Sequence, residues 1–248
     1  MFNNFDFSKM KAFKTQFNYI TFGAIAAILV LAQCKPENNS KRLLAQALKN
    51  KDYATAAFAY NNLLLEDSTN LDYKDSLARI YIRSGNFDGG LRLGEQVIAK
   101  RPGNNKLLEL ISVANGQLKK VDKSIENLNS LFKSTKDYTY LYKISGVYFD
   151  DGQFQKADSV CDKVIEFADS TKMVEINLPN GSSQSVPILA ACYNMKGAIL
   201  TEMAEISQNG ELVRKSIPYF QKAMQMAPDF AYPRLYLEKI AQFMQQSR

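Results

Sequence analysis

The chain has 248 residues, 46% of them hydrophobic, so it can bury a core, and its 12 glycines and 7 prolines are too few for a disordered or strand-and-turn protein. Its 31 basic and 25 acidic residues give a net charge of +6, with no basic run longer than two, which disfavours nucleic-acid binding. Histidine is absent, which excludes Ser-His-Asp and Cys-His catalytic systems and the usual zinc sites.

Motifs for cofactors and catalysis are also missing. The sequence has neither the phosphate-binding pattern GxxxxGKS/T nor the dinucleotide-binding pattern GxGxxG. Its three cysteines, Cys34, Cys161 and Cys192, form no CxxC pair. We therefore expect no catalytic residues, no metal site, no cofactor and no enzyme activity. We expect Cys161 and Cys192 to be small buried hydrophobic residues; a disulfide between them in an oxidising compartment is the alternative.

The first 33 residues have the layout of a secretory signal peptide. Lys9, Lys11 and Lys14 form a basic segment, and the apolar run ITFGAIAAILVLA follows at 20–32. This run has 13 residues, whereas a membrane-spanning helix needs about 20, so a cleaved signal is favoured over a permanent anchor. Met10 precedes the basic segment and is an alternative translation start.

The apolar run ends in Leu31-Ala32-Gln33-Cys34, which resembles the lipobox of bacterial lipoproteins. The resemblance implies cleavage before Cys34 and acylation of that cysteine, with residues 34–39 as a short polar tether. It also implies a lipid-anchored protein of the bacterial cell envelope, at the periplasmic or surface face of the outer membrane. Gln33 departs from the pattern, because the family has Gly, Ala or Ser there. An ordinary cleaved signal followed by an incidental cysteine is the alternative.

Beyond Ser40 the sequence repeats with a period of about 34 residues. Four kinds of position recur: a large apolar residue, a small residue three places later, a core residue four places after that, and an apolar doublet. The large apolar positions are Tyr53, Phe87, Val121 and Phe154, and the small ones are Ala56, Gly90, Ser124 and Ala157. The core positions are Tyr60, Gly94, Leu128 and Cys161, and the doublets begin at Leu63, Val97, Leu131 and Val164.

This pattern resembles the tetratricopeptide repeat, and the copy that matches best is 71–104. Its matching residues are Leu77, Ala78, Tyr81, Gly85, Phe87, Gly90, Val97 and Pro102. The resemblance implies an all-α, right-handed superhelical solenoid of about five helix pairs, in which the small residue lets the two helices of a pair approach closely. Residues 40–171 would hold units one to four.

The fifth unit is displaced by an insertion. Residues 172–189 alternate apolar and polar side chains around Asn180-Gly181, which predicts a β-hairpin. Residues 190–230 then form the fifth unit, and 231–248 form a C-terminal capping helix, as a solenoid needs for solubility. The hairpin is either a contact for a specific partner, through addition of a strand, or a surface excursion without a role.

In the family, the first helices of the pairs line a concave groove. The resemblance places these candidate groove residues: Asp72, Asp75, Arg79, Arg83, Tyr142, Phe149, Asp150, Asn194, Thr201 and Glu202. They would form a mixed-charge groove for a peptide or helix, and the alternative is an ordinary solvated inner face. Some family members grip C-terminal carboxylates with Lys and Asn, but Asp75 and Arg79 stand at those positions here.

The resulting prediction is a membrane-anchored scaffold or adaptor that binds other envelope proteins or peptides and attaches to the membrane through its N-terminal acyl chains. We expect no nucleic-acid partner. The alternative is a periplasmic or surface lipoprotein that binds a solute or glycan. The absence of Trp and of a second lobe to close over a ligand argues against this alternative.

Overall fold

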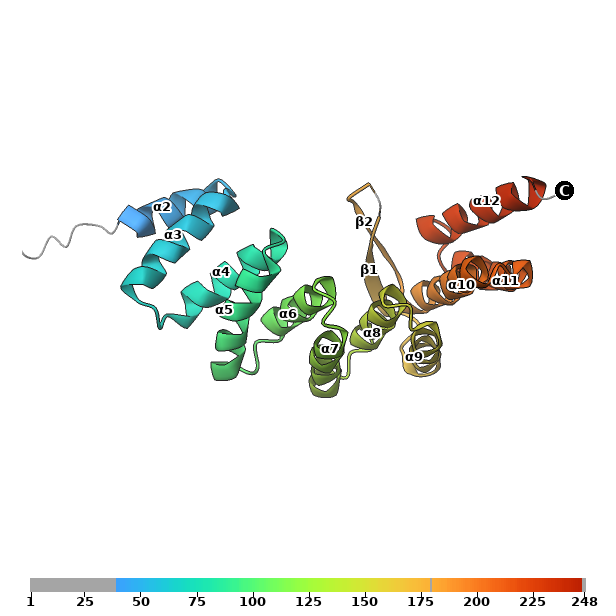
Figure 1. The fold of residues 1–248 in the computed structure, drawn as a ribbon, viewed down its shortest axis with the longest axis horizontal. Helices are drawn as coiled ribbons and strands as arrows, with labels where there is room; N and C mark the ends of the chain where they lie inside the picture. Colours follow the sequence, from blue (N-terminus) through green and yellow to red (C-terminus); the bar gives the residue numbers. More distant parts are fainter. Residues whose placement is uncertain (1–38, 179, 247–248) are drawn as a thin grey trace, which may run out of the picture. The chain divides into compact units, whose positions relative to one another are not determined.

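The computed structural model describes residues 39–178 and 180–246 (Figure 1). The expected signal peptide, the tether and Cys34 lie outside these residues, apart from Asn39. The chain divides into two compact units, 1–69 and 70–248. Each unit is described by itself below.

The described part of the first unit is one helix pair. Helix α2 spans Asn39–Lys49 and α3 spans Tyr53–Glu66, and the two pack against each other. Asp52 caps α3, because its carboxylate accepts the backbone N–H of Thr55 at 3.0 Å. The small residue Ala56 and the doublet residue Leu63 are both buried between the helices.

The second unit is a solenoid of four helix pairs, a β-hairpin and a final helix (Figure 1). The helices are α4 (Leu71–Arg83), α5 (Phe87–Lys100), α6 (Asn105–Gln117), α7 (Val121–Thr135), α8 (Thr139–Asp150), α9 (Phe154–Phe167), α10 (Ile188–Ser207), α11 (Gly210–Met226) and α12 (Ala231–Gln246). Each helix packs on the next one along the chain, and the hairpin is inserted between α9 and α10. The first helices also contact each other directly, α4 with α6 and α8 with α10.

The repeat seen in the sequence fixes where the helices begin and how they pack. The second helices α3, α5, α7 and α9 start at Tyr53, Phe87, Val121 and Phe154, the four recurring large apolar positions. The small positions are all buried. At Gly90 a Cβ atom would lie 2.4 Å from Cγ1 of Ile82, so α4 and α5 approach too closely for a larger residue. The predicted all-α, tetratricopeptide-like solenoid with a small β-hairpin is therefore confirmed.

One position in the turn within each of the first four pairs adopts a left-handed conformation. These residues are Lys51, Gly85, Lys119 and Gly152, with φ of 56°, 84°, 57° and 73°. Glycine adopts this conformation without strain, whereas lysine incurs a steric cost there. The third unit therefore makes the same turn with Lys119 that the second makes with Gly85.

The hairpin consists of β1 (Met173–Asn177) and β2 (Ser183–Pro187), paired antiparallel from Met173–Pro187 to Asn177–Ser183. Val174 and Val186, which face each other across the hairpin, are buried in one core cluster with Ile188 of α10. Because strand side chains alternate between faces, Glu175 and Asn177 lie on the opposite face of the hairpin. The insertion is thus half-buried structure rather than a free surface loop.

Ion pairs join the fourth unit to the hairpin and to the fifth unit. Nζ of Lys172, just before β1, lies 2.9 Å from Oδ2 of Asp137, just before α8. Nζ of Lys196 in α10 lies 2.6 Å from Asp158 and 2.8 Å from Asp162, both in α9. The Lys196 side chain is only 8% exposed. Burial alone would lower its pKa, but the two carboxylates outweigh burial and raise it.

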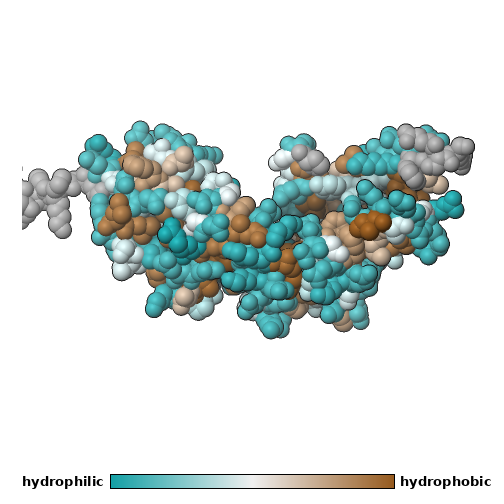
Figure 2. Space-filling view, viewed as in Figure 1, coloured by the Kyte–Doolittle hydropathy of each residue, from teal (hydrophilic) through white to brown (hydrophobic). Residues whose placement is uncertain are grey.

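The visible face of the second unit is mostly hydrophilic, with hydrophobic residues in small patches (Figure 2). None of the described helices has both the length and the apolar character needed to cross a membrane.

Candidate functional site

A groove with a cavity of about 640 Å³ lies between α6, the first half of α7, α8 and strand β1. Its volume is within the range of small-ligand and peptide-side-chain sites. The lining residues are Ser112, Val113, Gly116, Gln117, Lys119, Val121, Ser124, Leu128, Lys143, Gly146, Val147, Asp150, Asp151, Glu175 and Asn177. We call this cavity the α6–α8 groove.

Apolar and small side chains supply much of the surface of the α6–α8 groove. Val113 is 47% exposed although it is apolar, and Val147 on α8 is half-buried. At Gly146, in the middle of α8, nothing lies within 4 Å of where a Cβ atom would be. The groove is therefore open at this glycine, and a larger side chain there would project into unfilled space.

Charged groups of both signs surround this apolar surface. The Lys143 ammonium group forms an ion pair with Glu109 of α6, and it lies 5.8 Å from the ring centre of Tyr140. Partial burial raises the pKa of Asp150, and the positive charge of Lys119 opposes this with a smaller effect. The groove can therefore pair with charged groups of a ligand as well as with apolar ones.

The hairpin forms a fixed wall of the groove through Glu175 and Asn177 of β1. The Tyr232 hydroxyl of α12 donates to the carbonyl of Asn177 at 2.9 Å. The Gln184 amide donates to the carbonyl of Asp229 at 2.6 Å and accepts the N–H of Ala231 at 3.1 Å. The wall is thus held in place, because β1 and β2 are tied to the start of α12 and packed on α10.

Three of the four predicted groove residues of the second repeat pair with side chains of the same repeat, on α4 itself or in the loop that follows α5. Asp75 and Arg79 of α4 pair at 2.8 Å, and Arg79 also donates to the side chain of Asn104, just before α6, at 2.9 Å. Asp72 pairs with Arg101 at 2.5 Å. The fourth predicted residue, Arg83, is exposed at the end of α4. These four residues do not line the α6–α8 groove.

Two predicted groove residues, Tyr142 and Phe149, are aromatic and pack against their own chain. Tyr142 lies against the core cluster that contains Cys161, Cys192 and Val174, and burial raises its pKa far above the ordinary value of 10.0. The ring of Phe149 meets that of Phe154 edge-on, with the ring centres 5.7 Å apart. Asp150, next in the chain, does line the groove.

The predicted residues of the fifth repeat lie on α10. Asn194 has a buried side-chain oxygen for which the described residues provide no hydrogen-bond partner. Burial raises the pKa of Tyr236 in α12, and the charge of the half-buried Glu202 raises it further. Thr201 donates to the carbonyl of Gly197 at 3.0 Å.

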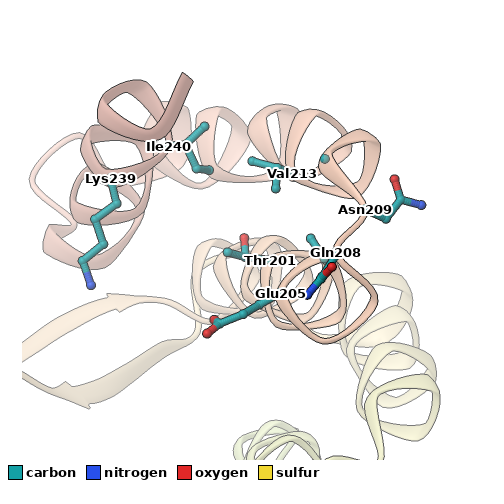
Figure 3. A pocket seen from close by; sticks show the side chains of 9 residues that line it. Thr201, Glu205, Gln208, Asn209, Val213, Lys239 and Ile240 are labelled. Atoms are coloured by element: carbon teal, nitrogen blue, oxygen red, sulfur yellow. The ribbon is translucent and has the colours of Figure 1, made fainter. Parts of the chain in front are cut away.

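Thr201 also lines a second cavity of about 460 Å³, formed by α10, α11 and α12 (Figure 3). Figure 3 shows Thr201 and Glu205 on α10 and Gln208 just after it, with Val213 on α11 and Lys239 and Ile240 on α12 around the opening. The cavity surface is mainly apolar. The structure thus brings Asp150 and Thr201 to two different cavities rather than to one continuous site.

Several residues of the α6–α8 groove were not predicted. Lys119 was not predicted because it lies in a turn and not on a first helix. Lys143 lies on α8 beside the predicted Tyr142. Glu175 and Asn177 belong to a hairpin whose alternation was recognised, but the sequence did not indicate which helices it covers. The strict alternation of strand side chains was the available signal, because it already placed Glu175 and Asn177 on the face opposite Val174.

Cys161 and Cys192 are both buried free thiols in one core cluster. A hydrogen bond between the two thiols lowers the pKa of Cys161 and raises that of Cys192. In the part of the chain that the structure describes, no group of three or more Cys, Asp or Glu side chains is arranged to hold a metal ion.

No family model and no curated protein matches this sequence. Solved structures do resemble it. A crystal structure of MamA protein has a TM-score of 0.56 at 16% identity over 77% of this chain and 94% of that chain. A second MamA crystal structure has a TM-score of 0.54 at 16% identity over 81% of this chain and 97% of that one. At this identity the likeness concerns the fold alone.

A thermophilic TPR protein of Thermus thermophilus also matches, at 15% identity over 82% of this chain and 98% of that chain. The TM-score of this match is 0.47.

Proposed function

We propose that this chain is a non-catalytic scaffold that holds a segment of a partner protein in the α6–α8 groove. The observation that carries the proposal is the open cavity over α6 and α8 with apolar surface, charged residues and a fixed β-strand wall. Helix-pair solenoids bury a continuous core and leave a long helical surface for partners. The fold is that of such a solenoid, and structural likeness to MamA extends over most of the chain.

Photo-crosslinking from two positions tests this proposal. A benzophenone amino acid replaces Gln117, which is exposed and lines the groove, or Ser159, which is exposed on α9 and does not line it. In the cells that make the protein, we expect one dominant cross-linked partner from position 117 and not from position 159. Gly146→Leu, which fills the open space in the groove, should abolish that product. Equal cross-linking from both positions, or persistence in Gly146→Leu, would refute the proposal.

We further propose that the scaffold is tethered to a bacterial envelope membrane, at the outer membrane, by acyl chains on Cys34. Support comes from the sequence alone: the basic segment, the short apolar run and the cysteine at its end. Acylation contributes about 0.8 kcal/mol of membrane affinity per buried CH₂, so two or three chains would hold the protein firmly.

Detergent phase partition tests the tether. The wild-type protein should enter the detergent phase, and Cys34→Ser should remain in the aqueous phase. Globomycin, which blocks lipoprotein signal cleavage, should cause accumulation of a longer precursor. A Cys34→Ser protein that still partitions with detergent would show that the membrane attachment has another cause.

A further inference from the structure

The hairpin limits how far a ligand can extend along the first helices. Helix α10 packs directly against α8, so a groove running along the first helices would continue from α8 onto α10. The lining of the α6–α8 groove nevertheless includes Glu175 and Asn177 of β1 and, among the described residues, none from α10. Strand β1 therefore forms the end of the groove on the side of α10.

The wall is rigid enough to exclude a ligand rather than give way to it. Val174 and Val186 bury one face of the hairpin in the core. Hydrogen bonds of Gln184 and Tyr232 join the hairpin to the start of α12. Displacing it would expose core residues and break those hydrogen bonds. A long helix lying across several repeats does not fit such a bounded site, whereas a short segment does.

The charged residues that line the groove favour a positively charged ligand. Lys143 is already paired with Glu109, which leaves Lys119 as the other lining cation. Three carboxylates also line the groove: Asp150, Asp151 and Glu175. The groove is therefore locally acidic, although the whole chain carries a net charge of +6.

We infer that the α6–α8 groove selects a short basic segment of its partner, with a Lys or Arg side chain placed between the carboxylates of Asp150 and Glu175. This inference rests on the proposed scaffold function and specifies the chemistry of its ligand. The apolar surface at Val113 and Val147 contacts the partner side chains that flank this Lys or Arg, and β1 limits the length of the bound segment. The pairing of a cation with carboxylates also makes binding weaken as salt is added.

A positional-scanning library of acetylated octapeptides, bound to the full-length protein, tests the inference. We expect Lys and Arg to be enriched at one or two positions in low salt. Asp150→Asn and Glu175→Gln should each reduce that enrichment by about two- to fivefold, the range for a partly exposed ion pair. Glu166→Gln is the matched control, because Glu166 is exposed on α9 and lies outside the groove. It should leave the enrichment unchanged.

The other outcomes separate this inference from the proposed function. Enrichment of acidic or neutral residues that is lost in Gly146→Leu would keep the groove as a binding site and overturn its preference for basic segments. Basic enrichment that persists in Gly146→Leu, or no enrichment at all, would also overturn the inference, because binding would not depend on this groove. The scaffold function itself is judged by the cross-links from position 117.

Discussion

Two glycines on first helices should respond in opposite directions to the same added methyl group. Gly146 in α8 has nothing within 4 Å of a Cβ position, whereas at Gly197 in α10 a Cβ would lie 2.6 Å from Cε1 of Phe220. Replacing glycine by alanine inside a helix stabilises it by about 0.8–1 kcal/mol. Gly146→Ala should therefore raise the free energy of unfolding by about that amount.

Gly197→Ala gains the same helix propensity but loses more through overpacking. Phe220 is fully buried and stacks on Tyr236 with the ring centres 4.7 Å apart, so the ring has little room to move. Overpacking a core costs about 1–3 kcal/mol, which leaves a net destabilisation of up to about 2 kcal/mol. The two variants should thus differ by about 1–3 kcal/mol.

Urea unfolding followed by far-ultraviolet circular dichroism measures both variants against the wild-type chain. We expect the urea midpoint of Gly146→Ala to rise and that of Gly197→Ala to fall. In thermal unfolding of the same variants, the melting temperature should shift in the same directions by about 2–4 °C per kcal/mol. Shifts of the same sign would refute the reasoning, because they would mean that the two positions do not differ in the space around them.

Four further variants test the packing between and within repeats. Lys196→Met should change the free energy of unfolding by less than about 1 kcal/mol. The double variant Asp158→Asn and Asp162→Asn should lower it by about 2–4 kcal/mol, because it leaves the buried Lys196 ammonium group unpaired. Equal losses in the two variants would contradict this. Lys51→Gly should raise the melting temperature, because it removes the steric cost of about 1 kcal/mol of a lysine in the left-handed conformation. A lower melting temperature would show that Lys51 is not strained. Burial alone would raise the pKa of Asp137, but hydrogen bonds from Lys172 and Thr139 outweigh burial and lower it. The ionised Asp137 therefore stabilises the folded chain above pH 3.8, its ordinary pKa, and this stabilisation is lost as the pH falls through the lower pKa of the folded state. Asp137→Asn should therefore flatten the acid limb of a stability–pH curve, and an unchanged limb would count against the ion pair.

The fold was predictable because each repeat needs residues of the same kind at the same positions for its helices to pack. Gly90 and Ala157 must be small where helices meet, and Leu131 and Val164 must be apolar where they are buried. Such requirements recur at a fixed spacing, so they are visible in one sequence. The hairpin was predictable as well, because its alternation of side chains is local.

The site was less predictable because it depends on contacts between distant segments. Asp72, a predicted groove residue, pairs with Arg101, 29 residues away, in the loop before α6. Tyr142 packs into a core cluster that the hairpin completes with Val174. A pattern on one helix cannot show which loop or insertion will cover its face. Asp150, at the end of α8, lines the α6–α8 groove.

Hydrogen–deuterium exchange of the protein, with and without the partner cross-linked from position 117, tests the central claim most directly. We predict that the partner slows exchange in α6, α8 and β1, which line the α6–α8 groove together with part of α7, and leaves α9 and α11 unchanged. Protection confined to α9 and α11, with none in α6, α8 or β1, would contradict the claim that this groove holds the partner.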